Sequence, residues 1–397
     1  MEGEVIPMNP ENIRSAQFID TYFPVVDGVV NTVHNYATLM NRTSYCCVVC
    51  PQEKGKFDDA TLPYDVIRAA SLRLPISNYA AAWPKNPALV QRVLEKAPLD
   101  IIHVHSPLVI RGSAVQSAKK LGIPLVATFH SKYYDDFLQV TKSKTLARHL
   151  TDWIVKFYDQ CDAVWTCSES TAETLRSYGY QKEISIIQNG TDLVYPKNAS
   201  YLRKKAMHCL HMQQDRKTLL FVGSLFWKKN IRLILETFRI LCDEDASAYR
   251  LILVGDGDEG KEIRAFAKSL GFDKEQLIFT GHIGSRDFLS GLFLASDLFF
   301  FPSLYDNAPL VLREAAALGV PALLAEGSCA SEVIRPEVNG YLEKADQRLM
   351  AQKIRRIFSD PAKRKETGER AKETIPLLWE KIIPMVYEKY AEVIGRK

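Results

Sequence analysis

Residues 297–321 read DLFFFPSLYDNAPLVLREAAALGVP, and this stretch decides the fold predicted for the chain. Residues 298–301 are apolar at every position, as in a strand that is buried on both faces of a parallel sheet. Pro302 ends this strand, because proline lacks the backbone N–H that a central strand donates. The polar loop 303–307 therefore lies at the carboxyl end of a strand, where open α/β sheets bind their ligands.

A helix is predicted directly after this loop, from about residue 309 to residue 318. Asn307 is a suitable N-cap, Pro309 fits a first helical turn, and Gly319 suits the end of a helix. The first turn of such a helix offers unpaired backbone N–H groups and the positive end of the helix dipole. We therefore expect the loop and the helix start to bind an anion such as a phosphate.

Two carboxylates bracket this first turn, Asp306 in the loop and Glu314 inside the helix. A site for phosphate alone would not favour both, whereas a ligand with phosphate and vicinal hydroxyls would. At these residues the chain resembles the glycosyltransferase family 4, whose members are retaining, nucleotide-sugar-dependent enzymes with the two-domain GT-B fold. That family carries two Glu eight positions apart, then a small-residue helix and Gly-x-Pro. Asp306 departs from the pattern by one methylene.

The resemblance implies a role for each residue of this stretch. Asp306 would bind hydroxyls of the donor hexose and take part in catalysis, and Glu314 would accept a hydrogen bond from the nucleotide ribose. The resemblance also implies a UDP- or GDP-hexose as the donor substrate, with no cofactor and no metal ion. The donor diphosphate would be held at the helix start by Asn307, Ala308, Pro309 and Leu310.

The composition is that of a globular protein. The 397 residues suffice for two domains with a core each, and 47% of them are hydrophobic and 25% charged. The net charge of +4 is slight for this length and does not indicate nucleic acid as a partner. No apolar run approaches the roughly 20 residues of a membrane-spanning helix, and residues 1–4 are acidic, so a cytoplasmic location is expected.

Strand-like runs alternate with helical stretches along the chain, which indicates βαβ units and a parallel sheet. Two sets of strands, separated by the polar stretch 189–215, predict two Rossmann-like domains. We predict an N-terminal domain of residues 1–195, completed by a C-terminal helix of residues 376–397, and a C-terminal domain of residues 196–375. The predicted strands are 17–22, 44–50, 100–105, 124–130, 163–167, 184–187, 218–222, 250–254, 276–280, 298–301 and 322–325.

The resemblance implies the arrangement of these two domains. In a GT-B enzyme they face each other across a cleft, the first binding the acceptor and the second the nucleotide sugar. In relatives a last helix crosses back to the first domain, and Trp379, Ile383, Val386 and Tyr387 recur here at helical spacing. The likeness spans nearly the whole chain and is most specific in residues 298–342.

The first predicted strand is followed by FPVVDGVVN, residues 23–31, in which Gly28 lets the backbone come close to a ligand before a helix begins. A single glycine after a strand is more often only a turn. Similar family members carry Pro, a small loop and Gly at this place, and their loop faces the donor phosphates and the acceptor. The resemblance therefore implies that Gly28 contacts the donor and Asp27 the acceptor.

Three histidines lie at predicted strand ends. His103 and His105 share one face of a strand, a spacing that suits a metal, but no carboxylate accompanies them, so satisfied structural histidines are favoured. His130 closes a strand at the carboxyl edge of the sheet, and the resemblance implies that it lines the reacting sugar as a catalytic and acceptor-binding residue. The alternative for His130 is a buried histidine bonded to backbone. Cys47 and Cys50 have redox or metal spacing, yet their apolar surroundings favour buried reduced thiols.

The second domain opens with LLFVGSLFWKKN, residues 219–230, in which a strand, a glycine turn and two lysines precede a helix. Lysine near such a turn suits a diphosphate, whose charge it neutralises. Family members carry Gly-Arg where this chain has Gly223 and Ser224, and Lys at the position of Lys229. Lys229 is therefore predicted to bind the donor and to act in catalysis, with Ser224 beside the donor. Lys228 either compensates for the missing arginine or is an ordinary solvated charge.

Asp256 and Asp258 follow the next strand. Such a pair could hold Mn²⁺ or Mg²⁺ against a diphosphate, as in GT-A, the other main glycosyltransferase fold. The same place in the resembled family is a Gly-Asp-Gly turn without metal, and Asp and Gly are ordinary turn residues, so we predict no metal site. After the third strand of this domain, the resemblance implies that Gly281 and Ile283 contact the donor.

Residues 138–158 have a helical pattern, with Leu146, Leu150, Trp153 and Phe157 at three- and four-residue steps and basic residues near the start. The favoured interpretation is an ordinary helix whose apolar face lies in the core. The alternative is a basic amphipathic surface that docks on anionic lipid, which would place the protein at the inner face of the membrane.

Together these features predict a retaining glycosyltransferase that moves a hexose from a nucleotide-diphosphate sugar to an acceptor hydroxyl. The leaving diphosphate would be stabilised by Lys229 and the helix start at Pro309, and the resemblance implies no protein nucleophile. The acceptor expected by analogy is a lipid or a lipid-linked cell-envelope glycan. One alternative is an epimerase or phosphorylase on the same fold. The other is a non-catalytic nucleotide-sugar-binding protein, which Ser224 and Asp306 favour because they replace residues that the family carries.

Overall fold

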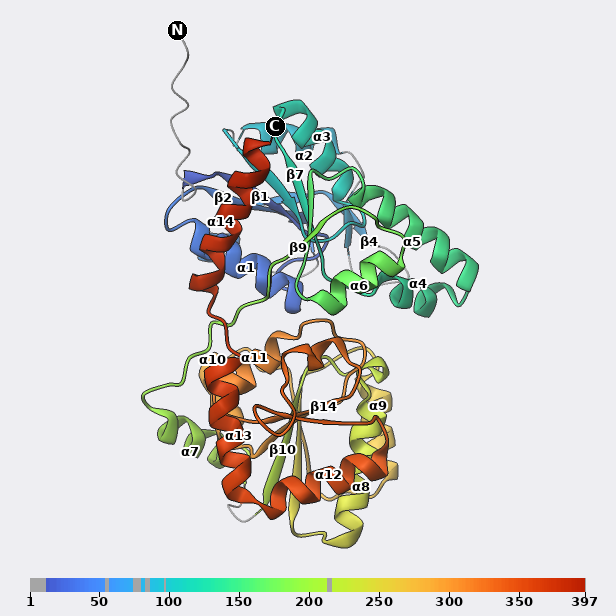
Figure 1. Ribbon diagram of the computed structural model, residues 1–397, viewed down its shortest axis with the longest axis vertical. Coiled ribbons are helices and arrows are strands. Elements are labelled where there is room, and N and C mark those ends of the chain that lie inside the picture. Colours follow the sequence, from blue (N-terminus) through green and yellow to red (C-terminus); the bar gives the residue numbers. More distant parts are fainter. Residues whose placement is uncertain are drawn as a thin grey trace. The chain divides into compact units, whose positions relative to one another are not determined.

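The computed structural model describes residues 12–53, 57–73, 80–82, 86–95, 98–212 and 216–396. The chain forms two compact units: unit 1 comprises Met1–Asn189 and Trp379–Lys397, and unit 2 comprises Gly190–Leu378 (Figure 1). The sequence pattern places these boundaries after residues 195 and 375. They lie elsewhere because the residues after Asn189 pair within unit 2, where the Thr191 N–H donates to the Leu377 carbonyl at 2.8 Å.

In the described part of unit 1, one sheet of seven strands is parallel throughout. Its central strands are buried at every residue, as expected for a sheet covered by helices on both faces. A separate antiparallel pair is formed by β4 (Ser71–Arg73) and β5 (Ala80–Ala82). The order in the main sheet is β3 (Asp65–Ala69), β2 (Cys46–Pro51), β1 (Ser15–Phe18), β6 (Ile101–Val104), β7 (Leu125–Phe129), β8 (Ala163–Thr166) and β9 (Ile184–Ile186).

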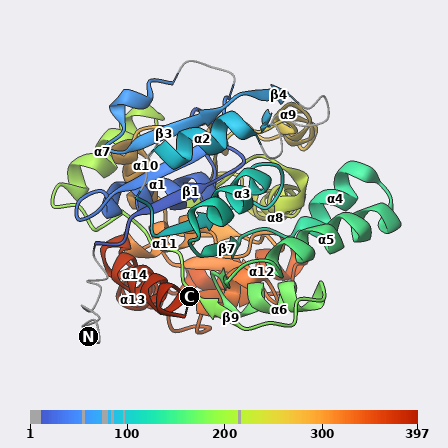
Figure 2. The ribbon, with the colours of Figure 1, turned by 90° about the horizontal axis from the view of Figure 1, so that it is seen from above.

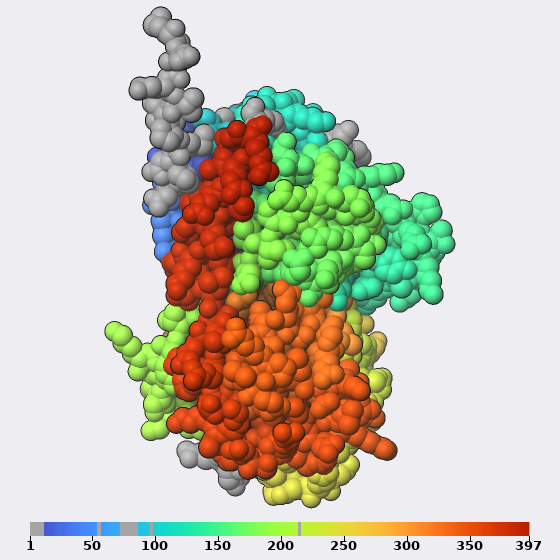
Figure 3. Space-filling view, viewed as in Figure 1, coloured from blue at the N-terminus to red at the C-terminus, as the bar shows by residue number. Residues whose placement is uncertain are grey.

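Helices cover this sheet, and the last of them comes from the far end of the chain. The space-filling view shows α14 (Trp379–Gly395), in red, on the surface of unit 1 (Figure 3). It packs against α1 (Gly28–Met40), so the predicted return of the C-terminal helix to the first unit is confirmed. The others are α2 (Pro87–Glu95), α3 (Arg111–Leu121), α4 (Tyr133–Thr141), α5 (Lys144–Tyr158), α6 (Glu169–Ser177) and the short 3₁₀ helix η2 (Asp59–Thr61).

The helix predicted over residues 138–158 is two helices. Lys142 ends α4 in the left-handed conformation, with φ +54°, and the Ser143 hydroxyl accepts from the Leu146 N–H to cap α5. Nothing in the apolar periodicity marks this break, because both helices carry apolar residues at helical spacing. In two views at right angles, α4 and α5 project from the rest of unit 1 (Figures 1 and 2).

In the described part of unit 2, six parallel strands form one sheet. Two of the predicted strands, 298–301 and 322–325, have the predicted bounds. The sheet order is β12 (Leu277–Gly281), β11 (Tyr249–Val254), β10 (Lys217–Val222), β13 (Leu298–Phe301), β14 (Ala322–Ala325) and β15 (Tyr341–Glu343).

The helices of unit 2 alternate with these strands. The predicted pair of parallel α/β units is therefore confirmed. The helices are α7 (Ala199–Cys209), α8 (Ile231–Glu244), α9 (Gly260–Ser269), α10 (Arg286–Leu294), α11 (Leu310–Ala317), α12 (Gln347–Ser359) and α13 (Pro361–Thr374), with 3₁₀ helices η3 (Trp227–Lys229) and η4 (Cys329–Val333).

The start of α11 differs from the prediction. Pro309, not Asn307, holds the N-cap position, with an extended backbone at φ −67° and ψ 126°. The helix therefore begins one residue later than expected, at Leu310. Pro309 can still precede the first turn at little cost, because its missing N–H is one that a helix start leaves without an intrahelical partner.

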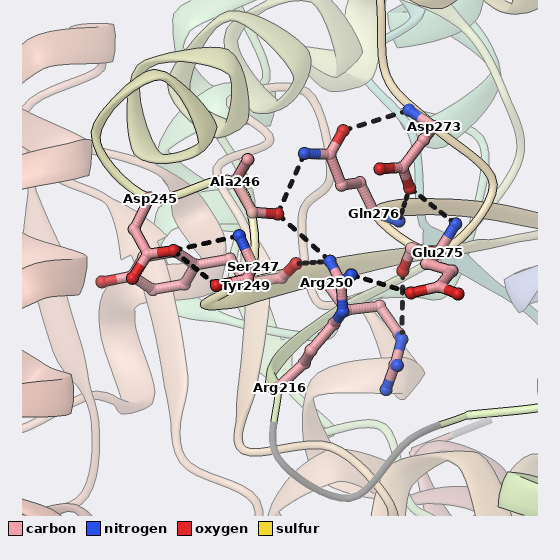
Figure 4. A network of polar contacts seen from close by, with 9 residues as sticks. All are labelled: Arg216, Asp245, Ala246, Ser247, Tyr249, Arg250, Asp273, Glu275 and Gln276. Atoms are coloured by element: carbon pink, nitrogen blue, oxygen red, sulfur yellow. Dashed lines mark hydrogen bonds and ion pairs between the residues drawn. The ribbon is translucent and has the colours of Figure 1, made fainter.

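A polar network fixes the amino ends of β10, β11 and β12 (Figure 4). The buried Arg250 donates from Nε to the Glu275 carbonyl at 3.2 Å, and Gln276 Nε2 donates to the Ala246 carbonyl at 3.0 Å. Arg216 forms an ion pair with Glu275 at 2.8 Å. This edge of the sheet is thus occupied by its own polar partners, and the candidate site of unit 2 lies at the opposite, carboxyl edge.

Candidate active site

The loop after β13 brings the predicted hexose and diphosphate residues together. Lys229 Nζ lies 2.5 Å from Asp306 Oδ1, although the two residues are 77 positions apart in the chain. The Ser303 hydroxyl donates to the second carboxylate oxygen, Oδ2, at 2.6 Å. The two charged side chains are only 14% and 16% exposed. The charge of the Lys229 ammonium group is therefore neutralised by the Asp306 carboxylate.

The loop that carries Lys229 begins at Gly223, directly after β10. Gly223 follows β10 with φ +158°, and a Cβ there would lie 3.2 Å from the Phe221 ring and 3.7 Å from Cδ of Lys229. Asn230, which follows η3, is left-handed with φ +59°, and its side-chain amide donates to the Pro302 carbonyl at 2.8 Å. The loop after β10 is thereby fixed to the loop after β13, with Lys229 between them.

Lys228 also contacts the loop after β13. Its ammonium nitrogen lies 4.0 Å from the centroid of the Tyr305 ring, within the range of a cation–π interaction. The contact places Lys228 beside the loop that carries Asp306, and both interpretations of this lysine, a solvated charge or a second cation at the site, stay predictions. Ser224 lies between β10 and η3, at the position where relatives carry arginine, and its carbonyl accepts from the Phe226 N–H at 3.0 Å.

The turn after β11 packs directly against the turn after β10. Gly255 has φ +127°, and a Cβ there would lie 2.0 Å from the Gly223 carbonyl oxygen, so only glycine fits. Asp256 Oδ1 accepts from the Gly257 N–H at 2.9 Å, which is a turn interaction. Among the described residues, no group of three or more His, Cys, Asp or Glu is placed to hold a metal ion.

Glu314 lies inside α11 and is 5% exposed. Its Oε1 accepts from Nη2 of Arg286 at 3.0 Å, and the same guanidinium group also pairs with Asp192. Burial raises the pKa of Glu314, and the positive charge and hydrogen bond of Arg286 act against that rise. Sequence reasoning missed Arg286, since a single arginine after a capping serine carries no signal of its long-range partners.

The other predicted donor residues of unit 2 lie at the carboxyl edge of the same sheet or at the start of α11. Gly281 ends β12 with φ +72°, and its carbonyl accepts from the Gly255 N–H at 2.9 Å. Ile283 follows it and packs against the core of unit 2. Asn307 is 7% exposed, Ala308 follows it in the loop, and Pro309 and Leu310 lie at the helix start.

The predicted residues of unit 1 form a different kind of arrangement. His130 follows β7, and its Nε2 lies 3.1 Å from Nδ1 of His105. His105 Nε2 lies 2.9 Å from Oε1 of Gln17, which can only accept. His105 therefore donates from Nε2 and accepts at Nδ1, and His130 donates to it from Nε2. Burial lowers the pKa of His130 to about 4, so its ring is neutral at neutral pH.

His103 belongs to the same buried group. Its Nδ1 lies 2.8 Å from the Tyr390 hydroxyl on α14, and its Nε2 lies 2.7 Å from the Thr128 hydroxyl. Burial also holds the pKa values of His103 and His105 well below the ordinary range. The prediction that these two histidines are satisfied structural groups is confirmed. His130 also contacts a side chain, that of His105, and the alternative for His130, a buried histidine bonded to backbone, stays a prediction.

Gly28 and Asp27 lie at the start of α1. Gly28 is the first residue of the helix, and Asp27 caps it: Oδ1 accepts from the N–H groups of Val29 and Val30, each at 2.8 Å. The carboxylate thus occupies the position where an anion would meet this helix end. Cys47 and Cys50 lie buried in β2, and burial raises the pKa of Cys50, as expected for unreactive thiols.

The favoured interpretation of the α5 region is partly wrong. Leu146 and Trp153 are 49% and 46% exposed, whereas Phe157 is buried. The buried residues of α5 are Ala147, Thr151, Ile154, Val155, Phe157 and Tyr158, most of which lie one position away from the predicted stripe. The Trp153 ring is covered on one side by the guanidinium of Arg111, 3.4 Å from the ring centroid. Within the described residues, no helix is long and apolar enough to cross a bilayer.

Two parallel α/β units, each with polar residues at the carboxyl edge of its sheet, are the architecture of the GT-B fold, which solved structures share with this chain. Two family models match the chain: Glycosyltransferase Family 4 over residues 26–195, and Glycosyl transferases group 1 over residues 204–374. The chain belongs to these glycosyltransferases. The predicted family and enzyme class are therefore confirmed, and the non-enzymatic alternative is not supported.

Curated relatives cover most of the chain at low identity. The alpha-monoglucosyldiacylglycerol synthase of Streptococcus pneumoniae is 23% identical over 88% of this chain and 79% of its own length. A GDP-mannose-dependent alpha-mannosyltransferase of Corynebacterium glutamicum is 24% identical over 96% of this chain and 90% of its own.

Solved structures share the fold. Sucrose-phosphate synthase from Thermosynechococcus elongatus superposes with a TM-score of 0.76 at 19% identity, covering 97% of this chain and 100% of its own. HepE of Anabaena, in complex with UDP and glucose, superposes with a TM-score of 0.74 at 18% identity, covering 95% of this chain and 99% of its own.

Proposed function

We propose that this glycosyltransferase moves a hexose from a nucleotide-diphosphate sugar to an acceptor hydroxyl, with retention of configuration. In this proposal unit 2 binds the donor and unit 1 binds the acceptor. The observation that carries it is the cluster at the carboxyl edge of the unit 2 sheet, where Lys229, Asp306 and the start of α11 converge. A cation and a helix N-terminus suit a diphosphate, and the carboxylates suit hydroxyl groups.

The chemical step that this cluster supports is departure of a nucleoside diphosphate. Negative charge develops on the diphosphate as the bond to the sugar breaks, and Lys229 and the N–H groups of α11 stabilise that charge. Lys229 is paired with Asp306 before the donor binds. The donor diphosphate displaces Asp306 from the Lys229 ammonium group. Asp306 is then available to accept hydrogen bonds from hydroxyls of the hexose.

Other residues serve the two ends of the donor. Glu314 accepts from a ribose hydroxyl, and the backbone around Gly281 and Ile283 borders the base. The donor is a UDP- or GDP-hexose, a choice supported by relatives named for GDP-mannose and by a structural neighbour bound to UDP. On the acceptor side, His130 contacts the sugar. Its ring is neutral there, because its pKa is about 4.

The acceptor in this proposal is a lipid or a lipid-linked glycan, reached from the cytoplasmic face of a membrane. One relative is named for the synthesis of a glucosylated diacylglycerol. Support from this chain comes from α4 and α5, where Val140, Leu146 and Trp153 are 46–55% exposed. Lys142, Lys144 and Arg148 lie among them, which is the combination that anionic lipid surfaces attract.

The test is a transfer assay with defined substrates. Purified protein is incubated with UDP-glucose, UDP-galactose or GDP-mannose, together with vesicles that contain diacylglycerol or an undecaprenyl-linked sugar. The proposal expects one donor to give a glycosylated lipid whose new bond has the anomeric configuration of the donor, as read by NMR. Inverted configuration would contradict retention. A new nucleotide sugar formed without acceptor would identify an epimerase instead.

A further inference from the structure

Arg286 joins two carboxylates that come from distant parts of unit 2. Its Nη2 donates to Oε1 of Glu314 at 3.0 Å and also pairs with Asp192. The side chain of Glu314 is 7% exposed, whereas that of Arg286 is 41% exposed. A buried carboxylate is thus held by a cation that water still reaches, and a second carboxylate pairs with the same nitrogen of that cation.

This pairing decides the charge of Glu314. Burial raises the pKa of the Glu314 carboxyl, because the charged form loses its hydration. The charge and hydrogen bond of Arg286 favour the ionised form, and the nearby negative charge of Asp192 disfavours it. Without Arg286, burial and the charge of Asp192 would remain, and both of them raise the pKa of Glu314. Arg286 therefore favours the ionised form of Glu314, which accepts hydrogen bonds at both carboxylate oxygens.

Contacts of two residues of α11 connect this helix to the segments where the chain enters and leaves unit 2. The chain enters unit 2 at Gly190, two residues before Asp192. It leaves after Leu378, and the carbonyl of Ile375, close to this exit, accepts from Nη1 of Arg313 at 2.5 Å. Arg313 is the neighbour of Glu314 in α11, so adjacent residues of one helix are connected to the entry and to the exit.

The entry and exit segments are also bonded to each other. The Thr191 N–H donates to the Leu377 carbonyl at 2.8 Å, and Thr191 pairs with Leu378 in a parallel bridge. Glu314, Arg286, the entry segment, the exit segment and Arg313 thus form a closed ring of contacts within unit 2. A ring of this kind leaves the Glu314 side chain little freedom to turn away.

We propose that Arg286 is a positioning residue for the donor nucleotide. It holds Glu314 ionised and keeps Oε1 engaged, so that Oε2 is presented to a ribose hydroxyl, and Asp192 holds Arg286 in place. Arg286 touches no reacting atom in this account. The inference rests on the proposed donor site, and it adds to that site a residue that neither the sequence pattern nor the family resemblance indicates.

The test is calorimetric binding of UDP and GDP, and of their 2′-deoxy and 3′-deoxy forms, to the full chain. The variants are Arg286→Ala, Arg286→Lys and Glu314→Ala. A matched control is Arg355→Ala, which removes another ion-paired arginine of unit 2 with 39% side-chain exposure. In the wild-type protein, removal of the recognised ribose hydroxyl is expected to cost about tenfold in affinity, the scale of one hydrogen bond to a charged group.

In Arg286→Ala at neutral pH, affinity for the intact nucleotide falls about tenfold and the deoxy forms bind no worse than the intact one. Both losses become smaller as the pH is raised, because the ionised fraction of Glu314 then increases. Arg286→Lys keeps part of the affinity, and Arg355→Ala keeps all of it. A purely structural role for Arg286 would not produce this pH-dependent recovery.

Two results overturn the inference in distinguishable ways. If Glu314→Ala loses affinity but Arg286→Ala keeps both its affinity and its hydroxyl penalty, the donor site stands and Arg286 has no positioning role. If the wild-type protein binds neither UDP nor GDP, the donor site itself is wrong, and the role of Arg286 falls with it.

Discussion

The candidate residues of the two units differ in their electrostatics. In unit 2 they are charged and paired with one another, as in Lys229 with Asp306 and Arg286 with Glu314. In unit 1 the candidate histidine, His130, is neutral and is joined to Gln17 through His105 by hydrogen bonds. The first arrangement suits an anionic ligand that displaces internal pairs, and the second suits a ligand recognised by shape and neutral hydrogen bonds.

The largest effect that would test this contrast is expected at Lys229. Lys229→Ala should lower kcat/KM for transfer by about 10²–10³-fold, the usual effect of removing one group that stabilises developing charge. Transfer rates with a saturating acceptor, together with a thermal melt to verify folding, measure this.

Two other lysines of unit 2 serve as controls. Lys228→Ala should lose less, because its ammonium lies over the Tyr305 ring and not beside Asp306. Lys261→Ala, an exposed lysine on α9, should be unchanged. Equal losses in Lys228→Ala and Lys229→Ala would show that the two cations share the work, contrary to the account given for Lys229.

The sequence predicts more of unit 2 than of unit 1, for a physical reason. β13, its loop and α11 are continuous in the chain, so strand, loop chemistry and helix start can be read together. Lys229 and Asp306 each follow a strand of one parallel sheet, which brings them to the same edge. Arg286 is different, since its partners Asp192 and Glu314 are 94 and 28 positions away and no local pattern connects them.

The misses in unit 1 follow from the limits of periodicity. β3 lies at the edge of the sheet and reads DVIRA, in which polar and apolar residues do not alternate regularly, so the pattern predicts no strand there. In α5 two apolar stripes lie side by side, and hydrophobic spacing alone does not say which of them faces the core. The contact between His105 and His130 joins two strands, so the orientation of the His130 ring depends on tertiary structure.

A second prediction concerns the packing of turns that places Lys229. Gly255→Ala should destabilise unit 2 by about 3 kcal/mol or more, because the new Cβ would lie 2.0 Å from the Gly223 carbonyl and neither backbone can yield easily. Differential scanning calorimetry measures the loss. Gly284→Ala is the control, since nothing lies within 4 Å of a Cβ there. Similar melting temperatures for the two variants would refute this packing.

A third prediction uses pH to separate the units. The folded pKa of His130 is about 4, against 6.5 for an ordinary histidine, and those of His103 and His105 are also depressed by burial. Below about pH 6.5 the unfolded chain therefore binds protons that the folded unit excludes. Above that pH the neutral histidines contribute their full share of the free energy of unfolding. As the pH falls, this free energy decreases by up to about 1.4 kcal/mol per pH unit for each histidine.

Asp20 opposes this trend. Burial raises its pKa from 3.8 to about 6, so the folded state holds a proton there that the unfolded state has released, and folding gains stability as pH falls. Three histidines outweigh one aspartate, and we expect the melting transition of unit 1 to move down between about pH 7 and about pH 5.5. His105→Gln should reduce that slope, and a transition that moved upward would contradict the neutral histidine chain.

The smallest effect is expected at the projecting helices of unit 1. The double variant Leu146→Ser, Trp153→Ser should weaken binding to vesicles of anionic phospholipid by about tenfold, because two apolar side chains no longer leave water. Sedimentation with vesicles measures it. Met385→Ser is a matched control, since Met385 is 45% exposed on α14 of the same unit. Equal binding of all three proteins would remove lipid docking from the proposal.

The central claim is that unit 2 binds a nucleotide-diphosphate sugar through Lys229, α11 and Glu314 without a metal ion. The most direct measurement is isothermal titration of the wild-type chain and Glu314→Ala with UDP-glucose and GDP-mannose, each with and without EDTA. The account predicts saturable binding of one donor that EDTA does not change and that Glu314→Ala weakens at least about tenfold. Binding that EDTA abolishes, or binding that survives unchanged in Glu314→Ala, would contradict it.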